Sequence, residues 1–417
     1  MFGLADCNNF FVSCERTLDP SLCDRAVVVL SNNDGCAIAR SNEAKKLGVK
    51  MGQPAFELRE MIEKGQLIAL SGNHMLYRKI SIRIHDLFRR YAPAVLDYSV
   101  DEAFLDMTGV PISELHPIGE AIYQAVWKEE KVPVTIGFAP TKTLAKVATE
   151  VGKKSGRRVV VLHDLAEIME VLRKLPIKDV WGIGRRLTKR LYMKGIYTAA
   201  DFALKDRMWV RGEMGVVGER SWLELNGESC IDLDHVDRQR QDSVSESRTF
   251  PIDIDDFDFL RSRIAIYCGH VSKRMRGMNG QCGAITVWLC TNRFHTERGY
   301  SAPSSSAEFN PPTSDAAVIT NAGVAILESI YRPGMLYKRA GVVLSHITPI
   351  GTLAPTLFDE IELQRREALK SRRLMQAIDQ LNSGCSTHML KLASELTKGH
   401  IGHNDGYSSS FGPAKKL

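Results

Sequence analysis

The chain has 417 residues, more than a single hydrophobic core usually organises, so several domains are expected. Hydrophobic residues make up 44% of it and charged residues 25%, which excludes collagen-like, coiled-coil and wholly disordered proteins. The net charge of +6 is too small for this length to identify a nucleic-acid or membrane partner by itself.

The cysteines and the N-terminal segment bear on the cellular compartment. Nine cysteines are an odd number and include no C-x-x-C pair, so neither a disulfide framework nor a zinc knuckle is indicated. The N-terminus lacks a basic region followed by an apolar run, and no stretch approaches the roughly 18 apolar residues of a membrane span. We expect a reducing, cytoplasmic location and no membrane partner.

The first 165 residues alternate between expected strands and helices. Residues 2–5 lead to Asp6 and to a helix that begins in FFVSCERTL, Val27–Leu30 reads as a strand, and SNEAKKL reads as a helix that stops at Gly48. Apolar residues at helical spacing between Leu76 and Phe88 predict a helix with one buried face. AVLDYSVDEAFLDMTG predicts two strands at a tight bend, and VPVTIGFA, TKTLAKVATEV and RVVVL complete an α+β sheet domain.

The chain changes character after residue 165. Residues 165–232 read as short helices with glycine-containing turns, and the polar linker DRQRQDSVSES follows. A second α+β unit is expected over about 243–350, with SAPSSSAEFNPPTSD as a long loop within it. In the tail, Leu374, Ile378 and Leu381 predict an amphipathic helix.

Three carboxylates could form a metal site. Asp6, Asp101 and Glu102 would lie at the ends of neighbouring strands, where mutual repulsion favours a divalent cation among them, and oxygen ligands suit Mg²⁺ or Mn²⁺. The residue types alone leave a turn or cap Asp and a solvated Asp-Glu pair as the alternative. The context favours the metal, because Asp97 and Asp106 add two acids on segments that are otherwise apolar enough to be core strands.

Several residues could bind the phosphates of a ligand beside those acids. Lys45 and Lys146 could offset the charge of a triphosphate, although each alone is more often an exposed helix residue. The backbone amides of residues 8–11 could meet phosphates at a helix start. For Phe10 and Phe11 the alternative is core packing, which we expect to hold for one of them.

WGIGRRLTKRL could bind the phosphates of a nucleic acid. Gly182 and Gly184 open a helix that carries Arg185, Arg186 and Lys189, so backbone N–H groups and basic side chains would share one end. A lone Gly-x-Gly is weak evidence and a basic helix face is often merely solvated. Together with LPIKDV, however, the segment resembles a helix-hairpin-helix phosphate clamp.

Positive charge is concentrated around this segment. Residues 141–190 contain 13 Lys and Arg against 5 Asp and Glu, a net charge of +8 that exceeds the +6 of the whole chain. Such a concentration indicates a surface that binds a phosphate backbone.

Five segments in order resemble the signature segments of Y-family translesion DNA polymerases of the UmuC type: MFGLADCNNFFVSCE, VVVLSNNDGCAIARSNEAKKLGVKMG, YSVDEAFLDMTG, APTKTLAKVA and VWGIGRRL. The resemblance runs from residue 1 to about 385. It implies an α+β multidomain, right-hand fold: palm and fingers at 1–165 with fingers at about 20–75, a helical thumb with a helix-hairpin-helix at 166–232, an α+β little finger at 243–350 and a UmuC-type tail at 351–417.

The resemblance also assigns roles to the acidic residues. By motif match, Asp6, Asp101 and Glu102 would be the catalytic, metal-binding carboxylates, with the carbonyl of Cys7 as a further ligand. The implied cofactor is a pair of Mg²⁺ ions, with Mn²⁺ as a substitute.

The implied nucleotide contacts lie in the first two segments and in the fourth. Phe11 falls at the family's steric gate, where a ring lies under the sugar and excludes a 2′-OH; UmuC-type members often have Tyr there. Asn42, Lys45 and Lys146 fall where the family contacts the incoming triphosphate, and Asn42 stands where other branches carry Tyr.

The implied function is error-prone, template-directed DNA synthesis across damaged DNA in the SOS response. The implied partners are primer-template DNA, dNTP, a processed UmuD-like homodimer, RecA and a sliding clamp. The family's clamp peptide Q-L-N-L-F corresponds to residues 354–358, which keep the Leu357-Phe358 anchor and lack the glutamine, so weakened clamp binding is expected.

Two other functions stay open on the residues alone. A non-catalytic DNA-binding mutagenesis accessory would use the basic region at 141–190 and would not need the acidic trio. A divalent-metal nuclease would use the same carboxylates and would degrade a primer without added nucleotides.

Overall fold

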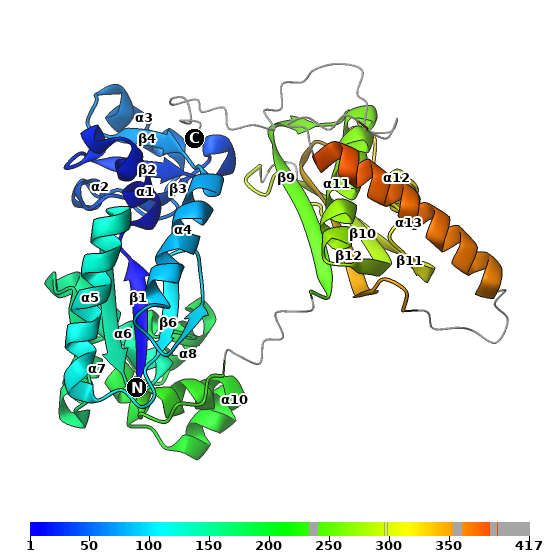
Figure 1. The fold of residues 1–417 in the computed structure, drawn as a ribbon. Helices are drawn as coiled ribbons and strands as arrows, with labels where there is room; N and C mark the ends of the chain where they lie inside the picture. Colours follow the sequence, from blue (N-terminus) through cyan, green and yellow to red (C-terminus); the bar gives the residue numbers. More distant parts are fainter. Residues whose placement is uncertain (233–240, 296, 298, 353–360, 384–389, 391–417) are drawn as a thin grey trace. The chain divides into compact units, whose positions relative to one another are not determined.

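The computed structural model describes residues 1–232, 241–295, 297, 299–352, 361–383 and 390, with the backbone alone at 33 and 361–369. The described residues up to 232 form one unit and those from 241 onward form a second (Figure 1). In this part of the chain no helix combines the length and the apolar character needed to cross a membrane.

A five-stranded sheet in the order β5-β6-β1-β7-β8 lies at the centre of the first unit. Its middle strand β1 pairs antiparallel with β6 and β7, and β8 runs parallel to β7. The strands are β1 Phe2–Cys7, β5 Ala94–Asp97, β6 Glu102–Asp106, β7 Val134–Ala139 and β8 Val159–Val161. The pair of strands expected at a tight bend is confirmed by β5 and β6.

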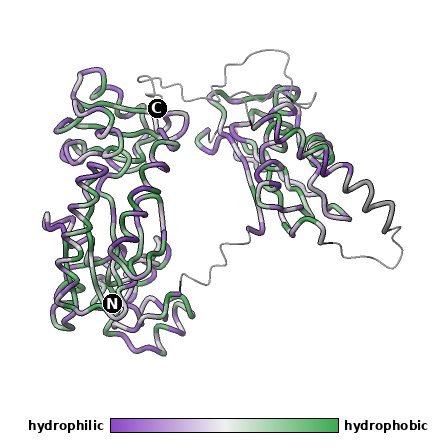
Figure 2. The backbone as a smooth tube through the Cα atoms, in the orientation of Figure 1, coloured by the Kyte–Doolittle hydropathy of each residue, from purple (hydrophilic) through white to green (hydrophobic). Residues whose placement is uncertain are grey.

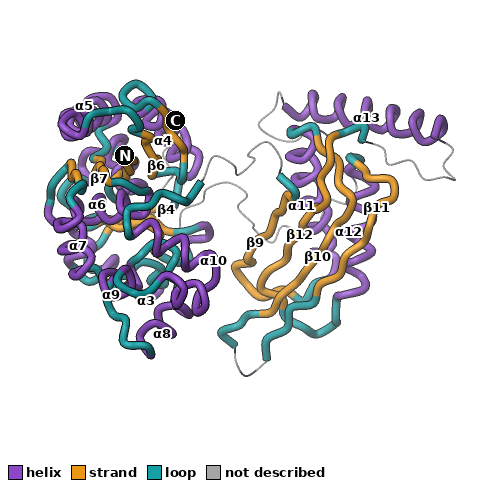
Figure 3. The backbone as a smooth tube through the Cα atoms, turned by 90° about the horizontal axis from the view of Figure 1, so that it is seen from below, coloured by secondary structure: helices purple, strands orange, loops and turns teal. Residues whose placement is uncertain are grey.

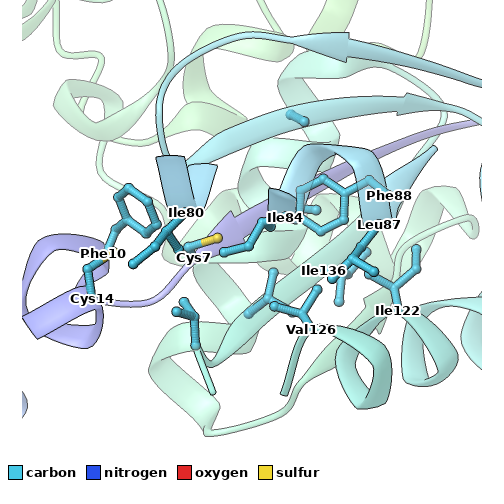
Figure 4. Packing of buried hydrophobic residues seen from close by; sticks show 14 of the residues in the cluster. Cys7, Phe10, Cys14, Ile80, Ile84, Leu87, Phe88, Ile122, Val126 and Ile136 are labelled. Carbon is cyan, nitrogen blue, oxygen red and sulfur yellow. The ribbon is translucent and has the colours of Figure 1, made fainter. Parts of the chain in front are cut away.

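Helices cover both faces of this sheet. They are α1 Phe10–Leu18, α4 His74–Phe88, α5 Ile112–Glu130 and α6 Lys142–Ser155. Because side chains alternate along a strand, Ala5 and Cys7 of β1 pack toward α4 and α5, whereas Leu4 packs toward α6. Figure 4 shows the first of these cores, where side chains of α1, α4 and α5 meet β1 and β7.

A smaller sheet and a group of helices complete the first unit. The sheet, in the order β3-β2-β4, and its helices comprise β2 Val27–Leu30, β3 Ala37–Arg40, α2 Asn42–Lys46, α3 Ala55–Glu63 and β4 Ile68–Ser71. Gly48 follows α2 with φ +84°, the left-handed conformation expected at that helix end. The helices after residue 164 are α7 Leu165–Lys174, α8 Arg185–Met193, α9 Ala199–Ala203 and α10 Arg207–Leu225.

The second unit is a four-stranded antiparallel sheet in the order β11-β10-β12-β9, with α11 and α12 on one face (Figure 3). Its elements are β9 Ser243–Ile254, α11 Phe257–Gly277, β10 Gly280–Thr291, β11 Ser304–Thr313, α12 Ala316–Ile330, β12 Tyr337–Pro349 and α13 Ile361–Ser383. Apolar stretches run along the packed strands and helices of both units (Figure 2).

One expectation for the second unit is wrong, and one for the tail is met only in part. The segment expected to be a long loop contains β11, an edge strand whose side chains alternate between half-buried and exposed and which tolerates Pro311 and Pro312 near its end. The helix expected in the tail is present as α13, but among its described side chains Met375 and Asn382 are buried, whereas Leu374 and Leu381 are 57% and 56% exposed. The ion pair of Asp379 with Arg276 of α11 fixes which side of α13 packs.

The closest approach of α6 to the sheet occurs at Gly137 of β7. A Cβ there would clash with the backbone nitrogen of Thr149 and would lie 2.7 Å from the carbonyl oxygen of Ala145. We expect Gly137→Ala to lower the free energy of unfolding by about 1–3 kcal/mol, because neither backbone atom can move aside. Thermal unfolding followed by circular dichroism measures this.

Gly212→Ala is the matched control for that measurement. Gly212 lies in α10 with no atom within 4 Å of an added Cβ, so alanine should be neutral there or should stabilise the helix by up to about 1 kcal/mol. Equal unfolding midpoints for the two variants would contradict the close packing of α6.

Candidate active site

Two of the three expected carboxylates face each other across neighbouring strands. Asp6 and Glu102 are register partners in β1 and β6. Asp101 lies in the bend before β6, where its carbonyl accepts a hydrogen bond from the Cys7 N–H at 2.9 Å and its carboxylate accepts one from the Ser99 hydroxyl at 2.5 Å. The sheet thus gathers the three acids at one end of β1.

Two lysines of α6 bind these carboxylates. Lys146 Nζ lies 2.8 Å from Glu102 Oε2, and Lys153 Nζ lies 2.5 Å from Asp6 Oδ2. Sequence reasoning found Lys146 but missed Lys153. The sequence feature that could have identified Lys153 is its spacing of seven residues from Lys146, because seven residues are about two helical turns and place both lysines on one face of a helix.

Burial shapes the ionisation of this pair of acids. Asp6 is 6% exposed, and burial raises its pKa to about 7 although Lys153 acts to lower it. For Glu102 burial also acts to raise the pKa, but the hydrogen bonds with Lys146 and Asp6 outweigh it, and the pKa lies below its ordinary value. A further cation beside the two carboxyls would favour the ionised form of both.

The donor atoms fit a hard divalent cation. Carboxylate oxygens of Asp6, Asp101 and Glu102 and the carbonyl of Cys7 belong to the ligand type that Mg²⁺ and Mn²⁺ prefer. Among the described residues no three His, Cys, Asp or Glu side chains are already grouped closely enough to hold an ion. An ion would therefore have to share the carboxylates with the two lysine ammonium groups.

The acidic cluster is smaller than the sequence suggested. Asp97 pairs with Arg89 at 2.6 Å and with His85 at 3.1 Å. Asp106 lies at the other end of β6, opposite Phe2, and accepts a hydrogen bond from the Thr108 hydroxyl. The four acids Asp97, Asp101, Glu102 and Asp106 therefore do not form one cluster, because the length of β6 separates Asp106 from Glu102 and the partners of Asp97 draw it toward α4.

Asn9 connects two of the expected triphosphate contacts. Asn9 precedes α1 in a left-handed conformation, with φ +50°, donates to Asn42 Oδ1 at 3.0 Å and accepts from Lys45 Nζ at 2.6 Å. Burial lowers the pKa of Lys45, and the charge of Lys153 acts in the same direction, which links α2 electrostatically to the carboxylate site.

The two aromatic residues at the start of α1 have different surroundings. Phe10 is 3% exposed and belongs to the core, so its ring offers no surface to a nucleotide and only its backbone remains available (Figure 4). Phe11 is half-buried and stacks on Tyr77 with ring centroids 4.4 Å apart. It lines a cavity of about 560 Å³ between α4 and the bend at 97–100.

The glycines and basic residues of the helix-hairpin-helix pattern lie at the start of α8, directly after Trp181, whose ring contacts the ammonium of Lys146. Gly182 has φ +90° and Gly184 is the residue before the helix. Arg185, Arg186 and Lys189 are exposed and make no ion pair within the described part of the chain. The clamp residues Leu357 and Phe358 lie outside the described residues.

The carboxylate site should bind a divalent ion. Because a ligand that binds only the folded state stabilises it, Mg²⁺ or Mn²⁺ at a hundredfold excess over Kd should stabilise the protein by about 2.7 kcal/mol. Asp6→Asn should lose most of this gain, as measured by the shift in unfolding temperature with added ion. Asp106→Asn should keep it, and equal shifts in the two variants would refute the site.

Comparisons with known proteins match most of the chain. Residues 5–150 match the impB/mucB/samB family, residues 241–357 match the C-terminal domain of that family, and residues 166–196 match the IMS family HHH motif. The chain is 37% identical to Protein UmuC of Salmonella typhimurium, over 92% of this chain and 90% of that protein. Protein ImpB of the same species is 36% identical over the same shares.

More distant proteins agree. DNA polymerase IV of Pelotomaculum thermopropionicum is 27% identical over 98% of both chains. Among solved structures, a Y-family DNA polymerase chimera of Dbh and Dpo4 superposes with a TM-score of 0.67 at 24% identity, over 84% of this chain and 100% of the other.

These likenesses confirm the α+β multidomain, right-hand fold expected from the sequence, and they do not favour a non-catalytic accessory. The chain belongs to the UmuC-type Y-family of translesion DNA polymerases.

Proposed function

We propose that this polymerase joins a primer 3′-OH to the α-phosphate of a dNTP at the site of Asp6, Asp101 and Glu102, with two Mg²⁺ ions. The observation that carries the proposal is the facing pair Asp6 and Glu102, bound by Lys153 and Lys146 of α6. Family membership implies dependence on a divalent metal in general. The oxygen donors of the site favour Mg²⁺ as the ion.

In this proposal the five-stranded sheet with α4, α5 and α6 is the palm, the sheet β3-β2-β4 belongs to the fingers, and α7 to α10 form the thumb. The second unit is the little finger. The proposal keeps the domain boundaries expected from the sequence, near residues 165, 232, 243 and 350.

Each group at the site has a role that its chemistry supports. Bound Mg²⁺ would activate the 3′-OH and stabilise the charge on the transferring phosphate and the leaving pyrophosphate. Asp6, Asp101 and Glu102 would hold the ions. Lys45 and Lys146 would bind triphosphate oxygens, which takes Lys146 from Glu102 when the substrate enters.

The start of α1 would bind phosphate as well. Asn9 precedes this nine-residue helix and makes no side-chain cap hydrogen bond, which leaves the first N–H groups to a ligand. Asn42, held by Asn9, would contact the same phosphates. Gly182, Gly184, Arg185, Arg186 and Lys189 would bind the DNA backbone at the thumb.

The partners are also part of the proposal. Primer-template DNA and dNTP are the substrates, and likeness to Protein UmuC supports a processed UmuD-like homodimer as a partner in the SOS response. RecA and a sliding clamp complete the set, the clamp through Leu357 and Phe358 without the family's glutamine.

Loss of one carboxylate tests the chemistry. Asp101→Ala should abolish primer extension across an abasic template, with the UmuD-like dimer present, because a ligand of the proposed ions is removed. Asp106→Asn should extend primers as the wild type does. A folded Asp101→Ala variant with wild-type extension would refute the assignment, and primer degradation without nucleotides would indicate a nuclease.

Loss of the ring of Phe11 tests the steric gate. We expect Phe11→Ala to raise the ratio of kcat/KM for rNTP over dNTP by about 100-fold, because space for a 2′-OH opens beside Tyr77. Tyr77→Phe keeps the stacked ring and loses only the hydroxyl bond to Glu15, so its ratio should stay near that of the wild type. An unchanged ratio in Phe11→Ala would rule out the gate.

A further inference from the structure

Glu224 is a fully buried acid of the thumb helix α10, 0% exposed, whose carboxylate binds backbone outside that helix. Its Oε2 accepts a hydrogen bond from the N–H of Thr143 at 2.9 Å. Its Oε1 accepts from the N–H groups of Cys230 at 2.9 Å and Ile231 at 3.1 Å. One carboxylate therefore ties the thumb to the first turn of α6 and to the segment that leaves α10.

Two further bonds close the same junction. The Thr141 hydroxyl donates to the backbone carbonyl of Glu224 at 2.7 Å. The Lys142 ammonium donates to the carbonyl of Ile231 at 2.9 Å. The residues that lead out of the first unit are thus fastened to the start of the palm helix α6, and the end of the thumb helix is fastened there too.

The junction requires a hydrogen-bond acceptor on both sides. Three N–H groups converge on the two oxygens of Glu224, and the N-terminal end of the 14-residue helix α6 favours negative charge. Glutamine has the same size but presents an N–H₂ group on one side, which cannot accept a hydrogen bond. Glu224→Gln therefore breaks one side of the junction without leaving a cavity.

Helix α6 connects the Glu224 junction to the carboxylate site. Lys146 lies three residues beyond Thr143, within one helical turn, and its ammonium contacts Glu102 at 2.8 Å. A shift of the first turn of α6 moves Lys146 with it, because a helical turn is held by its own hydrogen bonds.

We propose that Glu224 is a positioning residue for nucleotide binding: it holds the first turn of α6 so that Lys146 meets the triphosphate, and it fixes on the palm the point where the chain departs for the second unit. This inference rests on the proposed function of Lys146 as a triphosphate contact. Glu224 itself does not touch the reacting atoms.

A second buried acid of the same helix provides the contrast. Glu219 is 4% exposed and binds Arg207 and Arg211, both of α10 itself. Glu219→Gln makes the same chemical change in the same helix but leaves the bonds to α6 in place. It is the matched control.

The experiment is single-nucleotide incorporation by the full chain on an undamaged primer-template, with KM for dNTP and kcat measured separately. Glu224→Gln should raise KM about tenfold, the size of one lost hydrogen bond to a charged group, with Kd for primer-template unchanged. Glu219→Gln should leave KM at the wild-type value. In a Lys146→Gln background, Glu224→Gln should add no further increase in KM, because both changes remove the same contact.

Failure of the inference and failure of the proposed function give different results in this experiment. If the wild type does not extend primers, the proposed function is wrong. If the wild type extends primers but Glu224→Gln has the wild-type KM, the inference is wrong. The inference is also wrong if Glu224→Gln raises KM by the same factor in the Lys146→Gln background as in the wild type. Should Glu224→Gln fail to fold, Thr141→Val and Thr141→Ser decide. Valine loses both the hydroxyl bond to Glu224 and the cap bond from the Leu144 N–H, whereas serine keeps both. Higher KM together with faster exchange of the Cys230 and Ile231 amides in Val than in Ser supports the junction, and an unchanged KM or unchanged exchange of those two amides overturns it.

Amide hydrogen exchange tests the junction without an assay of enzyme activity. Either the amide of Thr143 or the amides of Cys230 and Ile231 should exchange faster in Glu224→Gln than in Glu219→Gln, according to the side that the NH₂ group of glutamine takes. Unchanged exchange at all three would contradict the hydrogen bonds that carry the proposal.

Discussion

The close contact between α6 and the five-stranded sheet is the constraint on which the candidate active site depends. Gly137 lets the backbone of α6 lie directly on β7, and Thr149 of the helix donates from its hydroxyl to the carbonyl of Leu4 in β1. At this distance Lys146 and Lys153 reach the carboxylates of Glu102 and Asp6. A bulkier residue at the contact would lift both ammonium groups from the site together.

Much of this arrangement could be predicted from local patterns. The strand ending in Asp6, the bend before Glu102 and the helix carrying Lys146 each follow from periodicity and turn residues, and the strands and helix stand close to where they were expected. The contact of Lys153 with the carboxylates could not be predicted in the same way, because in the sequence Lys153 stands beside Lys154 near the end of an expected helix. Its importance depends on which face of α6 meets β1.

The wrong predictions have physical causes that lie in residues distant along the sequence. β11 is polar and holds prolines, yet it pairs with β10 because an edge strand needs only one row of backbone partners. The packed side of α13 is set by Arg276, about a hundred residues earlier in the chain, which binds Asp379 with two nitrogens. Likewise Asp97 is drawn to Arg89 and His85 of α4.

The two lysines at the candidate active site also bear on how the protein reaches its folded state. A buried carboxylate without a counter-charge opposes folding, so a site made of acids alone would depend on an ion during folding. Lys146 and Lys153 supply positive charge from within the chain. The five-stranded sheet can therefore assemble before any ion arrives, and under the proposed function a shortage of metal would slow synthesis without reducing the amount of folded enzyme.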